Sequence, residues 1–347
     1  MSLLNTRMLD MRRQSDNLDK WTLRPSRYGA FDVFAMGNDE PDSIISPQLL
    51  NDAAVAVGRD VEIPVFDSET VSIGSTRSVT IADSENTSQI YTLSFTTYAW
   101  GFTIVPSLFQ NNEIAMQADF NRKMQKYLLQ FAADVDTACL SALSTAKSQV
   151  FADLLGIYSN VGNSIQVPLA NDQEILGDLT AIMNANDYYG SPFRIVGNSG
   201  VQSLVAKMSE YSEYNEQNKT IQWLDKTMHY TNRLSNASGK KATGYVVNPS
   251  SVGLVFRHER EAILGTMMDD GTEWNIDTLP LLNIPVSTYF YESKGDFNAI
   301  AGAASADMTR VRKEHYGFSV DIAYVTAYNT DLSTYASPIA KFEIANS

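Results

Sequence analysis

Residues 112–150 constrain the fold more than any other part of the sequence, because they contain neither glycine nor proline. Their apolar side chains recur at steps of three and four, which is the spacing of one face of an α-helix. A single helix over this stretch would be about 55–60 Å long. We therefore predict one long helix that lies across a surface and keeps its polar face in water, with a helix broken near its middle as the alternative. The apolar positions are Phe120, Met124, Tyr127, Leu128, Phe131, Val135, Ala138, Cys139, Ala142, Leu143, Ala146 and Val150.

The segment before this helix is typical of β-structure. Val61–Phe66 contains a proline and is therefore expected to be an edge strand. Residues 90–104 alternate between polar and apolar side chains and are rich in aromatics. Between them, Val71–Ile73 and Val79–Ile81 alternate on either side of a turn, which predicts a hairpin. This hairpin has too few apolar residues to pack a core of its own and needs support from elsewhere.

Residues 1–45 are polar, nearly balanced in charge and without a sustained apolar period. We expect an arm that becomes ordered against a neighbouring subunit, with a frayed tail as the alternative. Aromatic residues anchor interfaces, so Trp21, Tyr28, Phe31 and Phe34 are candidate contacts with that neighbour. Deletion of residues 1–40 is then expected to leave a soluble subunit that assembles poorly.

After residue 150, helical and strand patterns alternate, which predicts an α+β layout. Helices are expected at 172–186 and 200–211, followed by an exposed loop at 212–220. The last forty residues alternate strongly and are expected to form strands that return to the sheet begun at 61–105.

Charge and cysteine content exclude several classes of protein. The net charge of −14 and the pI near 4.6 disfavour tight binding to bare DNA or to an anionic membrane, because like charges repel. The single cysteine, Cys139, cannot form an intramolecular disulfide, and its small apolar neighbours indicate a buried thiol. The first residues lack the pattern of a signal peptide, so we expect the protein to work in the cytoplasm in which it is made.

No pattern in the sequence predicts a catalytic, metal or cofactor site. His229, His258 and His315 lack the spacing of zinc ligands. The densest acidic cluster comprises Asp269, Asp270, Glu273 and Asp277, and residues 267–272 have the composition of a solvated turn. Paired carboxylates there could instead perform acid–base chemistry or bind Ca²⁺. Trp274, within this cluster, is a further candidate for a subunit contact.

The order of these features resembles the major capsid proteins of tailed bacteriophages, which have the Hong-Kong-ninety-seven-type coat fold. Most of the resemblance lies in 91–150: the aromatic strand, the link Ile104-Val-Pro-Ser-Leu-Phe109, and the long helix containing Asp134-Val-Asp136. The resemblance implies an N-terminal arm at 1–45 and an extended loop, the E-loop, at 67–90. It implies a peripheral domain at 46–66 and 91–155 with a spine helix at 112–150. An axial domain would follow at 156–310, and the closing strands of the peripheral domain at 311–347.

The resemblance also implies a function, which is self-assembly into an icosahedral head that encloses phage DNA without catalysis. The expected partners are other copies of the chain in pentamers and hexamers, together with scaffolding and portal proteins. DNA would be enclosed without tight binding, no membrane or cofactor is expected, and the protein would be located in the virion after assembly in the bacterial cytoplasm. On the hairpin, Ile73, Arg77 and Val79 are further candidate subunit contacts. Because the sequence has no lysine between residues 21 and 122, the lysine–asparagine cross-link of some family members is not expected through this loop.

Three alternatives remain at this point. An encapsulin-like nanocompartment shell resembles the same fold. An acidic hydrolase could use the carboxylates of residues 269–277. A tail or baseplate protein would also consist mostly of interfaces.

Overall fold

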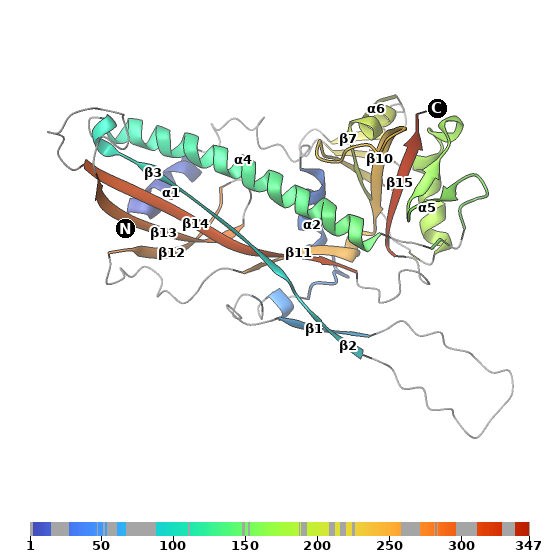
Figure 1. Cartoon of the computed structure of the whole chain (residues 1–347), viewed down its shortest axis with the longest axis horizontal. Coiled ribbons are helices and arrows are strands. Elements are labelled where there is room, and N and C mark those ends of the chain that lie inside the picture. The colour runs from blue at the N-terminus through green and yellow to red at the C-terminus, as the bar shows by residue number, and fades with distance from the viewer. Residues whose placement is uncertain are drawn as a thin grey trace, which may run out of the picture.

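The computed structural model shows an elongated molecule in which one long helix spans much of the body (Figure 1). A five-stranded sheet lies against this helix, and an eight-stranded sheet with two helices forms the other end of the body (Figure 1). None of the helices within the described ranges is long and apolar enough to cross a membrane. The structure describes residues 3–14, 28–46, 48–50, 53, 61–66, 88–109, 112–147, 150–151, 153–186, 188, 193–207, 212–215, 220–223, 226–257, 271–280, 282, 284–295, 311–327 and 337–346.

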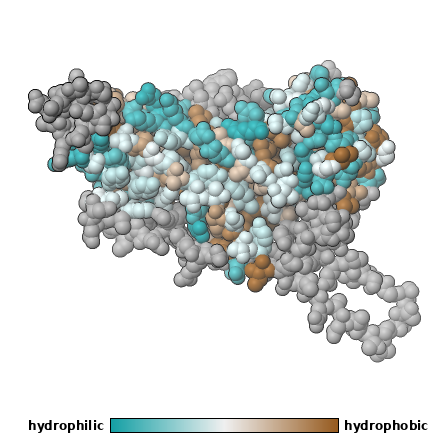
Figure 2. All heavy atoms as spheres, in the orientation of Figure 1, coloured by the Kyte–Doolittle hydropathy of each residue, from teal (hydrophilic) through white to brown (hydrophobic). Residues whose placement is uncertain are grey.

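The long helix predicted from the sequence is confirmed as α4, Glu113–Ala146, an unbroken helix of 34 residues. Its buried side chains fall at the predicted steps, with Phe120, Met124, Leu128 and Val135 all 0% exposed. Its other face carries polar side chains, and Figure 2 shows hydrophilic residues over much of the body on this side. The helix therefore braces the body with one face and leaves the other in water, as the periodicity predicted.

Asn112 caps the start of α4. Its side-chain oxygen accepts hydrogen bonds from the backbone N–H groups of Ile114 at 3.0 Å and Ala115 at 3.3 Å. Asn112→Ala should lower the free energy of unfolding by about 1 kcal/mol, because two N–H groups lose their acceptor. Urea unfolding followed by circular dichroism measures this change. The control, Ser144→Ala, alters an exposed serine on the same helix, and equal stability of the two variants would contradict the role of the cap.

The five-stranded sheet has the order β11–β14–β13–β12, and β3 pairs with the other side of β14. All of these pairings are antiparallel, and Gly317 of β14 lies opposite Gly101 of β3. The pairing of β14 with β3 confirms that the chain returns to the early β-segment. The strands are β3 (Phe95–Ile104), β11 (Val252–Arg257), β12 (Glu273–Thr278), β13 (Pro285–Gly295) and β14 (Val311–Thr326).

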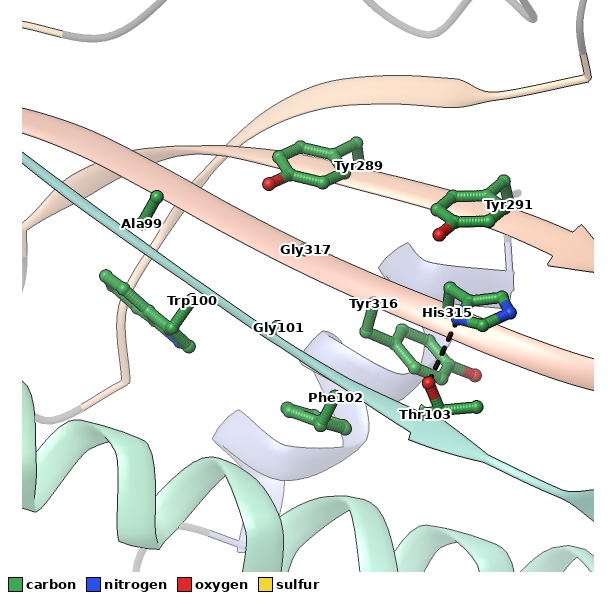
Figure 3. Close-up of a pocket in the computed structure, with 10 residues that line it drawn as sticks. All are labelled: Ala99, Trp100, Gly101, Phe102, Thr103, Tyr289, Tyr291, His315, Tyr316 and Gly317. Atoms are coloured by element: carbon green, nitrogen blue, oxygen red, sulfur yellow. Dashed lines mark hydrogen bonds between the residues drawn. The ribbon is translucent and has the colours of Figure 1, made fainter. Parts of the chain in front are cut away.

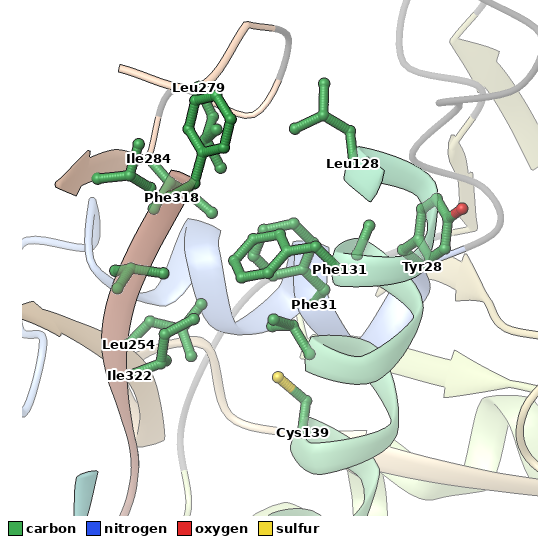
Figure 4. Close-up of a cluster of buried hydrophobic side chains, with 14 of the residues drawn as sticks. Tyr28, Phe31, Leu128, Phe131, Cys139, Leu254, Leu279, Ile284, Phe318 and Ile322 are labelled. Atoms are coloured by element: carbon green, nitrogen blue, oxygen red, sulfur yellow. The ribbon is translucent and has the colours of Figure 1, made fainter. Parts of the chain in front are cut away.

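Alternate side chains of β3 and β14 face α4 and build the main core. Phe102 contacts Phe120 of α4 edge-to-face at 5.3 Å, and Phe120 contacts Tyr316 at 5.1 Å. Trp100 lies between Phe131 of α4 and Phe318 of β14. Figure 4 shows this core between the helices and the sheet, with Cys139 inside it, so the prediction of a buried thiol is confirmed.

The eight-stranded sheet has the order β4–β5–β15–β10–β6–β9–β8–β7, with parallel pairing at β15/β5 and β6/β9. Helices α5 (Ile175–Ala185) and α6 (Ser199–Lys207) pack on it and share a second core, which confirms both predicted helices. Its strands are β4 (Ser159–Asn160), β5 (Ile165–Val167), β6 (Phe193–Gly197), β7 (Ser212–Asn215), β8 (Thr220–Trp223), β9 (Lys226–Tyr230), β10 (Lys240–Val247) and β15 (Ile339–Ala345). Short 3-10 helices occupy Pro106–Phe109, Leu169–Asn171 and Pro249–Ser251.

Two strands form a separate small sheet. Strands β1 (Glu62–Phe66) and β2 (Ser88–Thr92) pair antiparallel, from Glu62 opposite Thr92 to Phe66 opposite Ser88. We call this pair the β1–β2 ribbon. Its inner end is anchored by the buried Val61 and Leu93, next to β11 and β14. The hairpin predicted at 71–81 lies outside the described residues.

Two parts of the predicted arm at 1–45 form helices that pack in the main core of their own chain, and not only against a neighbouring subunit as expected. Helix α1 (Leu3–Gln14) buries Leu4, Met8 and Met11, which are 0–1% exposed. Helix α2 (Gly29–Gly37) lies against α4, β11, β9 and β6, between the two large sheets. The sequence misled because each helix buries only a few apolar residues, and their partners lie more than a hundred residues away.

The domain boundaries also need correction. Strands β11, β12 and β13 fall within the predicted axial range 156–310, yet they complete the five-stranded sheet with β3 and β14. Strand β15 was expected in that sheet and instead pairs with β10 and β5 in the eight-stranded sheet. The predicted loop at 212–220 contains strand β7 and the first residue of β8. Sheet membership depends on long-range pairing, which local alternation does not encode.

Candidate functional site on the open sheet face and at the α2 junction

The face of the five-stranded sheet that points away from α4 carries a pocket of about 360 Å³ (Figure 3). We call this surface the open face. The residues that point to it alternate with the core residues along each strand, as the pleat of a sheet requires. They come from three neighbouring strands and are Ala99, Gly101, Thr103, Tyr289, Tyr291, His315 and Gly317.

Two glycines that face each other form the floor of this pocket. A Cβ on Gly317 would lie 1.8 Å from a ring carbon of Tyr289, so the tyrosine ring takes the space of a side chain. A Cβ on Gly101 would lie 2.8 Å from the carbonyl oxygen of Tyr316. The Tyr289 ring therefore lies directly over Gly317, which only a glycine allows at this position.

The wall of the pocket is uncharged at neutral pH. The ring nitrogens of His315 lie 2.9 Å from the Thr103 hydroxyl and 2.7 Å from the Ser293 hydroxyl. Burial, and to a lesser extent Lys313, lowers the pKa of His315, so its neutral form is favoured. Its ring stacks on Tyr291 at 4.4 Å. An uncharged pocket with aromatic walls suits an extended protein segment or a ring-shaped ligand.

Trp274, a candidate contact residue, lies beside this pocket. It is half-buried on β12, and its ring lies 5.3 Å from that of Tyr289. Its indole N–H is buried without a hydrogen-bond partner among the described residues. A contact between Trp274 and another subunit remains a prediction, and its position next to the open face is compatible with one.

Three other candidate contacts occupy the core of their own chain. Tyr28, Phe31 and Phe34 are 0–6% exposed and pack with α4 and the five-stranded sheet (Figure 4). Their side chains therefore offer no surface to a neighbour, and the prediction that they form subunit contacts is corrected. The remaining candidates, Trp21, Ile73, Arg77 and Val79, lie outside the described residues.

A buried carboxylate of α4 organises the start of α2. One oxygen of Asp136 accepts hydrogen bonds from the backbone N–H groups of Ala30 at 2.9 Å and Phe31 at 3.0 Å. Its other oxygen accepts a bond of 2.6 Å from the Thr231 hydroxyl, just after β9. Asp136 thus performs the role of an N-cap residue from another helix, at the positive end of the α2 dipole. We call this contact region the α2 junction.

A second buried ionic group fixes helix α1. The guanidinium group of Arg7 donates to the Tyr316 hydroxyl at 2.7 Å and lies 3.4 Å from the carboxylates of Glu314 and Glu113. The Tyr316 hydroxyl donates to Glu314 at 2.7 Å. Arg7 and Glu314 are each only 2% exposed, so this charge pair is desolvated. Sequence reasoning missed both Arg7 and Asp136, because nothing in their local context distinguishes them from surface charges.

The structure gives the predicted acidic and histidine positions no common site. Glu273 and Asp277 lie on strand β12, while Asp269, Asp270 and His258 lie outside the described residues, as does most of the predicted turn at 267–272. His229 is buried, and burial lowers its pKa to about 4. Within the described part of the chain, no group of three or more His, Cys, Asp or Glu residues could hold a metal ion.

Comparisons with known proteins find similarity only among solved structures. No family model and no curated protein matches the chain. The solved structure entitled "Capsid structure of the Cyanophage P-SCSP1u" is similar at 10% identity with a TM-score of 0.45, covering 83% of this chain and 84% of that chain. A structure entitled "Asymmetric unit of bacteriophage PhiM1 mature capsid" is similar at 11% identity and a TM-score of 0.42, covering 83% and 82%. A third, "Mycobacterium phage Bobi", is similar at 14% identity and a TM-score of 0.44, covering 89% and 94%.

Proposed function

We propose that the chain is a structural shell subunit, the major capsid protein of a tailed bacteriophage. In this role many copies assemble side by side, and the protein performs no catalysis. The titles of two solved structures reported above name phage capsids.

The observation that carries the proposal is the β1–β2 ribbon. Its five residue pairs form a sheet of only two strands, and Figure 1 shows it projecting from the body. Two-stranded sheets are at best marginally stable in water by themselves. Ile90, at the centre of β2, is 69% exposed, so the ribbon presents an apolar side chain that its own subunit does not cover. A neighbouring copy that covers the ribbon would supply the missing support.

The open face is a surface against which such a neighbouring copy can pack. It combines two facing glycines with aromatic side chains, and none of its lining side chains is an Asp, Glu, Lys or Arg. The long helix α4 holds this sheet rigid from behind, which keeps contacts in register over its length. Many weak contacts of this kind add up when each copy is held by several neighbours.

The copies would form pentamers and hexamers in a closed shell, with scaffolding and portal proteins as further partners. The net charge of −14 suits a container that encloses DNA without binding it tightly. The shell would be assembled in the cytoplasm of the host bacterium and would become part of the virion.

Electron microscopy of the purified protein under assembly conditions tests this function. We expect spherical shells from the natural chain and at least tenfold fewer from Ile90→Asp, because a buried unpaired carboxylate would oppose the contact between subunits. Circular dichroism and thermal unfolding of the isolated subunit should remain close to those of the natural chain, since Ile90 is exposed there.

The control variant is Thr137→Asp, which places the same charge at an exposed position of α4, away from the ribbon. It should assemble normally if α4 only braces the sheet. A natural chain that stays monomeric at high concentration, or that forms rings or tubes, would contradict the proposal. Normal shells from Ile90→Asp would show that the ribbon is not the contact.

A further inference from the structure

Strands β3, β11 and β12 form the margins of the five-stranded sheet, and side chains of the same chain occupy the outer edges of two of them. On β11, the side-chain amide of Asn38 accepts a hydrogen bond from the Leu254 N–H at 2.9 Å and donates one to the Leu254 carbonyl at 2.8 Å. On β12, the side chains of Asn275 and Asp277 accept bonds from the N–H groups of the residues that follow them, at 2.9 and 2.8 Å. Another chain could pair with either margin only by displacing these side chains.

Strand β3 is the third margin, and the middle of its outer edge has no such cover. Among the described strands it pairs with β14, on one side. The Thr103 carbonyl accepts a hydrogen bond of 2.8 Å from the Lys123 ammonium group, so it points away from β14. Because backbone groups alternate in direction along a strand, the N–H and C=O groups of Gly101, Ala99 and Thr97 point the same way. Within the described part of the chain, these groups have no hydrogen-bond partner.

The sequence of β3 also lacks the residues that normally keep an exposed edge from pairing. The strand Phe95–Ile104 contains no charged residue and no proline. Thr97, Ala99 and Gly101 are exposed, and because Gly101 has no side chain, its exposure is that of the backbone. Figure 3 shows Ala99 and Gly101 along β3 beside β14. An uncharged edge with unpaired backbone groups is a template for a further strand.

Helix α4 lies beneath β3, and one turn of it is level with the centre of the uncovered edge. The Phe131 ring lies 5.1 Å from the ring of Trp100 and 5.5 Å from that of Tyr98. Ala99 stands between these two aromatic residues on β3. A symmetry axis that passed through Ala99 would therefore also pass close to this turn of α4.

The exposed side chains of α4 around this turn carry opposite charges on either side of it. Gln130, Lys126 and Asp134 are exposed, and the two charged residues lie one helical turn before and one turn after Gln130. They continue the side of the helix from which Lys123 reaches the edge of β3. A two-fold axis at this level would bring Lys126 of each copy toward Asp134 of the other. This charge complementarity favours a second copy of the chain as the partner.

We propose that two copies of the chain pair through the middle of β3, antiparallel and about a two-fold axis at Ala99. Thr97 of one copy would face Gly101 of the other, and Ala99 would face Ala99, with two backbone hydrogen bonds in each facing pair. The two five-stranded sheets would then form one continuous sheet with an isologous interface. This contact is separate from that of the β1–β2 ribbon, and it does not require a closed shell.

Charge substitutions at Ala99 test the pairing in the full chain. Ala99→Lys and Ala99→Glu each place like charges opposite one another at the axis, so each variant alone should dimerise at least tenfold more weakly than the natural chain. An equal mixture of the two variants should recover the dimer, because a lysine then faces a glutamate. Sedimentation velocity over a series of concentrations measures the dissociation constants. Since Ala99 is exposed, circular dichroism should show both variants folded.

Cysteine substitutions test the register. The Cα atoms of facing residues in a hydrogen-bonded antiparallel pair are about 5.5 Å apart, which a disulfide can span, so Ala99→Cys should give covalent dimers on mild oxidation. Thr97→Cys is the matched control on the same edge, because its two copies would be about 14 Å apart and should stay unlinked. The natural Cys139 is buried and does not compete.

A natural chain that stays monomeric in sedimentation, or a mixture of the charged variants that does not recover the dimer, would overturn the proposal. Equal cross-linking at both cysteine positions, or none at Ala99→Cys, would also overturn it. Electron microscopy of the same samples separates this inference from the shell function. Normal shells without the Ala99→Cys cross-link would contradict the pairing alone, whereas cross-linked dimers without spherical shells would support the pairing and contradict the shell.

Discussion

Gly37→Ala is expected to destabilise the subunit by about 3 kcal/mol, because the last residue of α2 touches the backbone of β11. A Cβ on Gly37 would lie 2.0 Å from the carbonyl oxygen of Val252 and 3.3 Å from that of Pro249. Neither atom belongs to a flexible side chain, so the methyl group can be accommodated only if α2 moves away from the five-stranded sheet. That movement would also disturb Phe34, which is 0% exposed.

Chemical unfolding of the isolated subunit measures this effect, with Gly177→Ala as the matched control. Gly177 lies in the first turn of α5, and a Cβ there would meet nothing within 4 Å. The control should therefore stabilise the protein by about 0.5–1 kcal/mol, the difference between glycine and alanine in a helix. If both variants unfold at the same denaturant concentration, Gly37 does not pack tightly against the Val252 carbonyl of β11.

Arg7→Met should cost a similar amount, about 3 kcal/mol, since it leaves a buried carboxylate without its buried partner. Glu314 is 2% exposed, and the cation that it would retain among the described residues is Arg312, whose side chain is 53% exposed and lies 3.2 Å away. The Tyr316 hydroxyl would keep Glu314 as its acceptor and lose the Arg7 donor. Met8 and Met11 would still fill the core, so the loss should come mainly from charge.

A double-mutant cycle separates this charge effect from packing. Arg7→Met combined with Glu314→Gln should recover part of the lost stability, because the second change removes the unpaired charge. Arg122→Met is the control for loss of a cation, because the Arg122 side chain is 69% exposed, and it should change stability by less than about 0.5 kcal/mol. Full stability of Arg7→Met alone would show that the buried ion pair contributes little.

The burial of Arg7, Met8 and Phe34 also changes the expected result of truncating the chain. Removing residues 1–40 would take away two helices from the main core, not only an assembly arm. The truncated chain should therefore aggregate or unfold, contrary to the soluble subunit expected from the sequence. Reduced assembly of such a variant would consequently say nothing about an interface.

The spacing of apolar residues predicted those helices and strands that have one clearly apolar face. Helix α4 follows from 34 residues without a helix breaker, and β14 follows from strict alternation around Phe318 and Val320. The return of β14 to the early β-segment was also predicted, while its antiparallel pairing with β3 is a finding of the structure. In these segments the hydrophobic period and the tertiary fold require the same structure.

The α2 junction could not be predicted from the sequence, because its contacts join residues that are far apart in the chain. Asp136 follows Val135 on a helix whose other acidic residues include the exposed Asp134, and only the arrival of α2 from 105 residues away distinguishes the two. The open face could not be predicted either, because Gly101 and Gly317 lie opposite each other only when β3 and β14 pair. Both sites are products of long-range contacts between residues that are unremarkable in sequence.

The bond between Arg7 and Tyr316 has a consequence for the order of events during synthesis. These two residues are 309 positions apart, so the first helix leaves the ribosome long before its partner exists. During translation, Met8, Met11 and Arg7 of α1 stay unburied until Tyr316 has been synthesised. Chains dominated by such distant contacts fold slowly, and we expect the newly made subunit to need protection from aggregation during this interval.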